Sequence, residues 1–199
     1  KAGIGMITSN VSVSGPIKEG ETSISASLRS TYSNWLARSV RTDYTDLRES
    51  NVFFYDGTVK VSHKFNEDNK LSFTGYSSHD AFKLVGDTTY RWNTNLASVN
   101  YDKQYSPDVG AKFTAGISNY DYNVEDENFR TASRLRYRLT AATTSAKLFK
   151  EKEGHKIDFG GHLNYYNFQP GELSPTSDVS NAANFSLDKQ NSIELAAFI

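Results

Sequence analysis

Hydrophobic and polar residues alternate with a period of two along most of the chain. In one segment, Phe53, Tyr55 and Val59 alternate with Asp56 and Thr58. Because successive side chains of a β-strand point to opposite faces, this pattern predicts strands with one apolar and one polar face. We expect about nine such strands, near residues 1–15, 21–31, 52–65, 70–79, 89–105, 111–122, 132–149, 156–168 and 190–199.

The alternation changes phase at two places. Ile4 and Met6 are out of phase with Ile7 and Val11, which predicts a bulge or a tight turn near Met6. A second change of phase, within residues 141–148, predicts the same kind of irregularity. Several predicted strands are much longer than the average of about 5–6 residues in globular proteins. Such lengths are typical of strands that cross a membrane obliquely and project beyond it.

The predicted connections are alternately short and long. The short ones carry turn residues, such as Gly15-Pro16, Pro107-Asp108 and Glu153-Gly154. The longer ones cover residues 32–51, 80–88, 123–131 and 169–189. Outer-membrane barrels have this alternation because their periplasmic turns are tight and their extracellular loops are larger. The sequence therefore predicts an all-β fold, an antiparallel up-and-down meander that forms part of a large transmembrane β-barrel.

Both ends of the sequence fit a part of such a barrel. The first segment runs toward a short, periplasmic turn, so we expect part of a strand before Lys1. Ile199 lies within an apolar alternation with no turn after it, and an open strand edge is not tolerated in lipid. We therefore expect residues 1–199 to be a partial barrel domain, with the plug domain and the remaining strands outside it.

The composition agrees with strands that face lipid on one side and water on the other. Hydrophobic residues make up 37% of the chain, below the roughly 45–50% of soluble domains, yet aromatic residues reach 13%. No apolar run approaches the roughly 20 residues of a transmembrane helix, whereas barrel strands cross in about 9–11 residues. There is no cysteine, and the net charge of -1 gives no reason to expect a nucleic-acid partner.

Several motifs occur in a familiar order. They are Ile4-Gly5-Met6-Ile7-Thr8-Ser9-Asn10-Val11 running into Ser14-Gly15-Pro16-Ile17, Ser27-Leu28-Arg29-Ser30-Thr31-Tyr32, Phe53-Phe54-Tyr55-Asp56 with Val59-Lys60-Val61 and the turn 66–71, Phe168-Gln169-Pro170-Gly171, and Glu194-Leu195-Ala196-Ala197-Phe198-Ile199. Together they resemble the barrel strands that follow the plug in Bacteroidetes TonB-dependent transporters of the SusC-like kind.

This resemblance carries several expectations. It implies a barrel of about 22 strands in the bacterial outer membrane, which imports a bulky nutrient such as a glycan, a peptide or a chelate. It also implies a plug that gates the barrel. The expected partners are outer-membrane lipid, a SusD-like surface lipoprotein that caps the barrel, and the TonB energy transducer. No cofactor is implied.

Three arginines are the sharpest polar candidates. Arg134, Arg136 and Arg138 alternate along one predicted strand, so their guanidinium groups share one face about 7 Å apart. Three like charges in lipid would cost several kcal/mol, so they must face the lumen or lie on the extracellular extension. They could contact an anionic ligand or the plug. The alternative, which we favour, is that they form salt bridges to acidic neighbours across the sheet, such as Glu194 or Asp158.

Aromatic residues near the predicted extracellular ends form a second group of candidates. Trp35, Tyr44 and Phe168 could contact a ligand or a partner protein in the extracellular loops. The alternative is an aromatic girdle at the membrane interface. We favour the girdle for Tyr120, Tyr122, Tyr166 and Phe168.

The sequence offers little support for catalysis or metal binding. It has no Gly-x-Ser-x-Gly element and no Walker loop, and its four histidines lack the spacing of paired metal ligands. Glu125-Asp126-Glu127 carries the oxygen ligands that Ca²⁺ prefers but also fits a solvated loop. We expect no enzyme. The remaining alternatives are an outer-membrane barrel without transport activity (structural, secretion-associated or adhesive) and a soluble, secreted β-rich binding module.

Overall fold

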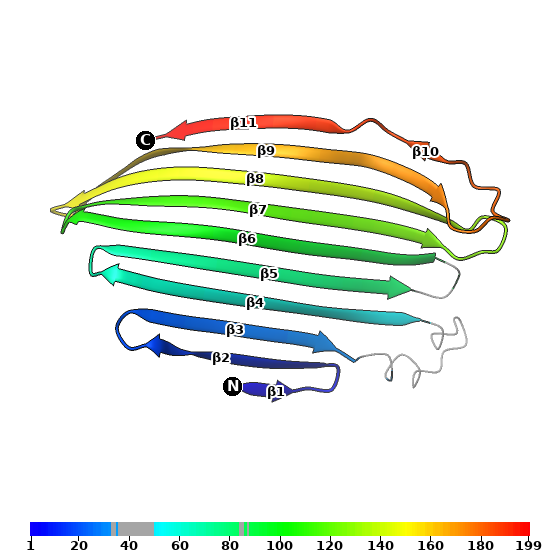
Figure 1. The fold of residues 1–199 in the computed structure, drawn as a ribbon, viewed down its shortest axis with the longest axis horizontal. Coiled ribbons are helices and arrows are strands. Elements are labelled where there is room, and N and C mark those ends of the chain that lie inside the picture. Colours follow the sequence, from blue (N-terminus) through cyan, green and yellow to red (C-terminus); the bar gives the residue numbers. More distant parts are fainter. Residues whose placement is uncertain (33–34, 36–49, 84–85, 87) are drawn as a thin grey trace.

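The computed structural model describes residues 1–32, 35, 50–83, 86 and 88–199. These residues form one antiparallel sheet whose strands lie side by side in chain order, except that the last two strands both pair with the strand before them (Figure 1). The all-β meander predicted from the sequence is therefore confirmed. The strands are β1 (Ala2–Ile4), β2 (Thr8–Lys18), β3 (Thr22–Thr31), β4 (Asn51–Asn66), β5 (Asn69–Lys83), β6 (Thr88–Ser106), β7 (Val109–Asp126), β8 (Ser133–Lys152), β9 (His155–Pro175), β10 (Phe185–Ser186) and β11 (Gln190–Phe198).

The phase change near Met6 is a tight turn. It separates β1 from β2, which pair antiparallel with Ile4 opposite Ser9, and the Gly5 amide donates to the Thr8 carbonyl at 2.8 Å. The irregularity predicted within residues 141–148 is wrong, because this part of β8 pairs in continuous register with both neighbours. The phase is ambiguous there because small residues, alanine and threonine, occupy both faces.

The register of β8 and β9 shifts closer to the far end of the hairpin. Arg138 pairs with Gln169 and Arg136 with Glu172, so Tyr137 lies opposite two residues, Pro170 and Gly171. Proline has no N–H to donate to the ladder and is found in sheets at edges and bulges. The bulge therefore lies in Phe168–Gly171, one of the motifs that resemble SusC-like transporters.

The connections at the two ends of the sheet differ as the sequence predicts. Residues 19–21, 67–68, 107–108 and 153–154 make the tight turns at one end, whereas the longer described connections, 127–132 and 176–184, lie at the other with the turn from β1 to β2 (Figure 1). Gly20 and Gly154 adopt positive φ of 74° and 80°, which glycine adopts without strain.

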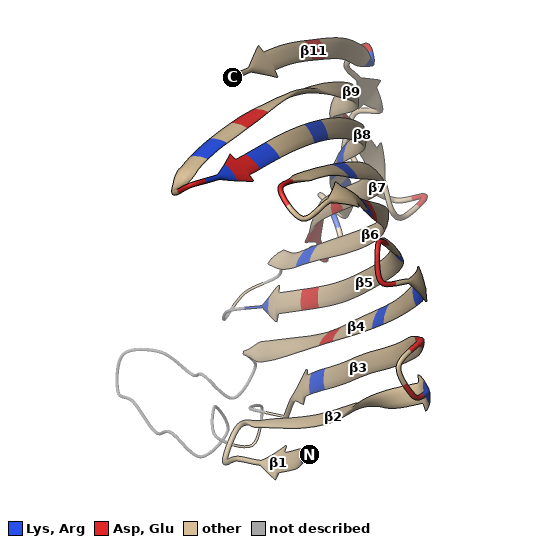
Figure 2. Ribbon diagram, turned by 90° about the vertical axis from the view of Figure 1, so that its left-hand side faces the viewer, with Lys and Arg blue, Asp and Glu red and all other residues tan. Residues whose placement is uncertain are grey.

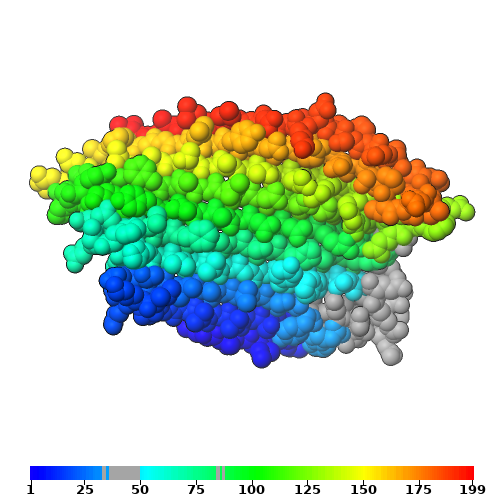
Figure 3. All heavy atoms as spheres, in the orientation of Figure 1, coloured from blue at the N-terminus to red at the C-terminus, as the bar shows by residue number. Residues whose placement is uncertain are grey.

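The sheet is a single layer. Viewed from the end that carries the tight turns, the strands stack one above another, and the described part of the chain places no second sheet against either face (Figure 2). The strands appear in Figure 3 as successive bands of the chain. Among the described residues, the only buried hydrophobic ones are Ala111 and Ala132. Soluble β-proteins bury one face of each sheet against another layer. This sheet has no such core.

Residues that pair directly across the strands project to the same face, so the register defines transverse rows. One row runs through Val13, Ala26, Val59, Gly75, Ala97, Ile117, Ala142, Tyr165 and Ile193. The next row toward the tight turns runs through Gly15, Ile24, Val61, Phe73, Val99, Ala115, Thr144, Leu163 and Leu195. Further rows follow on the same face toward the tight turns, as far as Ala111 on β7 and Ile157 on β9. We call all these rows together the apolar band.

The opposite face of the same strand segments is polar. Its corresponding row runs through Ser14, Ser25, Lys60, Thr74, Ser98, Gly116, Thr143, Asn164 and Glu194. The apolar side chains are well exposed despite their chemistry; Val13 is 63% exposed, Ile117 55% and Leu195 79%. The sheet thus has an uncovered apolar surface on one face and mostly hydroxyl and amide groups on the other.

Candidate functional site

The apolar face becomes polar where the strands approach the longer connections. The row beyond the apolar band holds Asn95, Asn119, Thr140, Asn167 and Asn191 on the strands from β6 to β11. The next three rows carry charges on β6, β7 and β8. We call this group the guanidinium ladder: Arg91, Asp121, Glu125, Arg134, Arg136 and Arg138.

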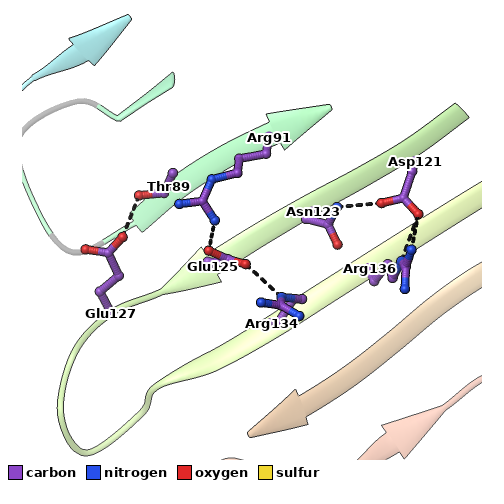
Figure 4. A network of polar contacts seen from close by, with 8 residues as sticks. All are labelled: Thr89, Arg91, Asp121, Asn123, Glu125, Glu127, Arg134 and Arg136. Carbon is purple, nitrogen blue, oxygen red and sulfur yellow. Dashed lines mark hydrogen bonds and ion pairs between the residues drawn. The ribbon is translucent and has the colours of Figure 1, made fainter. Parts of the chain in front are cut away.

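The ladder depends on the pairing of β7 with β8. Glu125 lies opposite Arg134, and Asp121 lies opposite Arg138, with Arg136 in the next row, opposite Asn123. Glu125 accepts a hydrogen bond from Arg134 Nε at 2.7 Å and another from Arg91 on β6 (Figure 4). The hairpin register therefore places carboxylates of β7 among the arginines of its neighbours.

Asp121 is shared by several donors. Its Oδ2 accepts from Arg136 Nε at 2.8 Å and lies 3.3 Å from Arg138 Nε, while Oδ1 accepts from Asn123 at 2.5 Å. Figure 4 shows Asn123 and Arg136 converging on this carboxylate. Two carboxylates thus serve four guanidinium groups within the ladder.

The carboxylates lie beneath the guanidinium groups. The side chains of Asp121 and Glu125 are 10% and 15% exposed, whereas those of the four arginines are 36% to 48% exposed. Each ion pair at such exposure contributes about 0.2–1 kcal/mol. Glu172, the exposed Cα partner of Arg136 on β9, adds one further carboxylate nearby. With it included, the ladder still has one more cation than anions.

A further ion pair continues the ladder toward the connection between β7 and β8. Glu127 accepts from Lys83 Nζ at 2.6 Å and from the Thr89 hydroxyl at 2.9 Å. The hydrogen bond from Lys83, followed by that from Thr89, holds the pKa of Glu127 below its usual range. Asp126, between the two glutamates, accepts instead from Thr131. The acidic run Glu125–Glu127 is therefore divided among separate donors.

The arginines predicted from the sequence come together, but the suggested partners Glu194 and Asp158 are wrong. Both carboxylates lie on the opposite, polar face. There Glu194 is 3.7 Å from His162, and Asp158 is 3.3 Å from Lys147. The alternation places the arginines on the apolar face, beyond the apolar band, so Asp121 and Glu125 are the carboxylates within reach.

The aromatic girdle expected of Tyr120, Tyr122, Tyr166 and Phe168 is also wrong. All four project from the polar face, as their register on β7 and β9 requires, and so cannot flank the apolar band. On that face Tyr122 instead forms an aromatic row with the neighbouring strands. This row was not predicted because it depends on cross-strand register. Its ring centroids are 6.2 Å apart for Trp92–Tyr122 and 5.9 Å for Tyr122–Tyr137.

Of the three predicted loop contacts, the two within the described residues, Trp35 and Phe168, are not brought together. Trp35 is 45% exposed and donates from Nε1 to the Met6 carbonyl at 3.0 Å, which ties it to the turn between β1 and β2. Phe168 lies on β9, at the opposite side of the sheet, and is 36% exposed. Tyr44 lies outside the described residues.

The apolar face also carries two shallow hollows. One, of about 670 Å³, lies over β3 to β7 where Ala26, Gly57, Gly75 and Ala97 leave room between larger side chains. The other, of about 520 Å³, lies over β6 to β11 around Ala115, Ala146, Gly161 and Ala197. The first extends to Asn95 and Asn119, next to the guanidinium ladder.

Comparison with family models, with curated proteins and with solved structures finds no match to the chain. Among the described residues, no helix is long and apolar enough to cross a membrane. The same residues contain no group of three or more histidine or acidic side chains placed to hold a metal ion.

Proposed function

We propose that residues 1–199 form part of the wall of an outer-membrane β-barrel that belongs to a TonB-dependent transporter of the SusC-like kind. The observation that carries the proposal is the single-layer sheet with an apolar band on one face and hydroxyl and amide groups on the other. A strand that separates lipid from a water-filled lumen needs this arrangement. A soluble binding module would instead need a second layer over the apolar band.

The height of the apolar band agrees with a membrane crossing. On β9 it extends from Ile157 to Tyr165, about 26 Å along the strand. The strand tilt of about 35–45° in barrels shortens this to roughly 20 Å in projection, close to the apolar belt of about 25 Å. The unpaired edges of β1 and β11 would pair with further strands in a closed barrel of about 22 strands, which has no edge in lipid.

Transport, rather than another barrel function, is supported by the order of the motifs. The segments at 4–17, 27–32, 53–71, 168–171 and 194–199 resemble SusC-like transporters in the same order along the chain. In this proposal the polar face lines the lumen, a plug elsewhere in the protein gates it, and a bulky nutrient passes through. A SusD-like surface lipoprotein and the TonB energy transducer are the partners that the resemblance implies.

The barrel wall can be tested with spin labels, because the chain has no native cysteine. Ile117→Cys and Ser118→Cys place a label on adjacent positions of opposite faces. In proteoliposomes of the full-length protein, we expect the label at 117 to be more accessible to oxygen and the label at 118 to a water-soluble nickel chelate. Equal accessibility to both reagents at both positions would reject the wall.

Transport needs a separate experiment. Whole cells that carry the protein should accumulate a glycan, peptide or chelate that cells lacking it do not, and deletion of the energy transducer should abolish that difference. Uptake that persists without the transducer would reject the TonB-dependent mechanism. A protein with a lipid-facing label at 117 but no uptake of any kind would indicate a barrel without transport activity.

A further inference from the structure

The guanidinium ladder is on the wrong face to meet a nutrient in the lumen. It shares the face of the apolar band, so in the proposed barrel it points outward. It begins two residues beyond the row of Asn95 and Asn119, about 7 Å along the strand. It also lies toward the longer connections, which are extracellular in such barrels. The ladder therefore lies at the level of the outer-leaflet headgroups.

The larger hollow leads directly to this level. Its floor is formed by Val59, Gly75, Ala97 and Ile117, which belong to one transverse row of the apolar band. Asn95 and Asn119 line its polar end, and Asn119 donates to the Thr140 hydroxyl at 2.9 Å. Arg138, the arginine of the ladder nearest to this row, lies two residues before Thr140 on β8 and on the same face. Apolar hollow, amide row and guanidinium groups thus follow one another on one surface.

The charges of the ladder suit a phosphate group. Four guanidinium groups share Asp121 and Glu125, which are the more buried members, so N–H groups remain on the outside. Guanidinium groups bind phosphate oxygens bidentately and more favourably than they bind neutral acceptors. The carboxylates hold the arginines in place and leave a net positive surface.

We propose that this face binds a phosphorylated lipid of the outer leaflet, with acyl chain in the hollow and phosphate on Arg136 and Arg138. The inference rests on the proposed function, because only a barrel wall presents this face to lipid. Charge complementarity favours a lipid over a second copy of the chain, since two copies of the ladder would repel each other. The lipid would fix the height of this part of the wall in the membrane.

The test uses the full-length protein in a neutral detergent and diphosphoryl lipid A as the probe, with binding followed by native mass spectrometry. The double variant Arg136→Gln/Arg138→Gln should bind at least about tenfold more weakly than the wild type, because two charged hydrogen-bond donors are lost. The matched control is Arg29→Gln. Arg29 is likewise half-exposed and paired with a carboxylate, Asp56 at 2.7 Å, but on the polar face. It should leave lipid binding unchanged.

A second pair of variants tests the hollow without touching any charge. Ala97→Leu fills the hollow next to the ladder, and Ala146→Leu fills the hollow farther from it. We expect weaker lipid binding for the first variant only. Equal loss for both variants, or no loss for either, would overturn the placement of the acyl chain. These variants remain informative if the double arginine variant does not fold.

Further arms distinguish the source of the phosphate. The wild type should bind dephosphorylated lipid A as weakly as the double arginine variant binds diphosphoryl lipid A. Inorganic phosphate should not displace diphosphoryl lipid A from the wild type. Equal binding of the dephosphorylated lipid, or displacement by inorganic phosphate alone, would overturn the proposal. Flotation with phospholipid vesicles separates the two levels of inference. A wild-type protein that floats but shows no phosphate preference rejects only the lipid site, whereas one that does not float rejects the wall as well.

Discussion

The two halves of one face of the sheet differ in chemistry. Near the tight turns, β6, β7 and β8 present Val99, Ala115 and Thr144 in one row; near the longer connections, the same strands and the same face present Arg91, Asn123 and Arg136. The backbone pairing is continuous through both halves. Strand geometry therefore decides only which way a side chain points. The chemistry of each face is set by the residue types that the sequence places in each row.

A charge placed in the apolar half should break this comparison most strongly. Val99→Arg puts a guanidinium group in the middle of the apolar band, where a barrel in lipid loses about 2–4 kcal/mol. Ser98→Arg, on the polar face of the same strand, should cost less than about 1 kcal/mol. Denaturant unfolding of the full-length protein in phospholipid vesicles measures both. Equal losses would mean that the apolar band does not face lipid.

Removal of a carboxylate from the charged half should have a smaller effect. Asp121→Asn leaves Arg136 and Arg138 without their shared anion. Hydrogen bonds to charged groups contribute about 1.5–3 kcal/mol, and partial exposure lowers this to roughly 1–2 kcal/mol here. Asp158→Asn is the control, because its single partner Lys147 lies at 3.3 Å on the polar face. The same unfolding measurement should rank Asp121→Asn as the more destabilising, and the reverse order would contradict the ladder.

The smallest expected effect is a pH dependence at the end of the ladder. The pKa of Glu127 is lowered by Lys83 and Thr89, so the folded state binds its proton less readily than the unfolded chain. The stabilisation is complete above the ordinary glutamate range and is lost as pH falls through the lowered pKa. Because the pair is exposed, it amounts to less than about 0.5 kcal/mol. Glu127→Gln should remove this part of the acid dependence, measured as unfolding free energy between neutral pH and pH about 3.

The fold could be predicted largely because apolar and polar residues alternate with a period of two along most of the strands. The alternation around Val59 and that around Ile193 each identified a strand and its apolar face, and the nine longest strands of the described residues are those predicted. The phase was lost at residues 141–148 because alanine and threonine do not distinguish a polar from an apolar face. The short strand β10 was missed because it consists of only Phe185 and Ser186.

The candidate site was predictable only in part. Alternation was enough to place Arg134, Arg136 and Arg138 on one face, but their partners depend on register, which the pattern does not fix. Asp121 and Glu125 have the same period of two on the preceding strand, and a symmetric hairpin through residues 127–132 would have placed them opposite the arginines. The polar-face pairing of Trp92 with Tyr122 likewise required the register of β6 and β7.

The tight turns also determine where the chain can be modified. Residues 107–108 join β6 to β7 with no spare length, so one added residue there must either loop out or move the following strand's side chains to the opposite face. Residues 127–132 form a longer loop between β7 and β8, so extra residues can be accommodated there without changing the register of the two strands. Foreign epitopes, affinity tags or fluorescent reporters therefore belong in the second connection, where they would be displayed while the wall below them keeps its alignment.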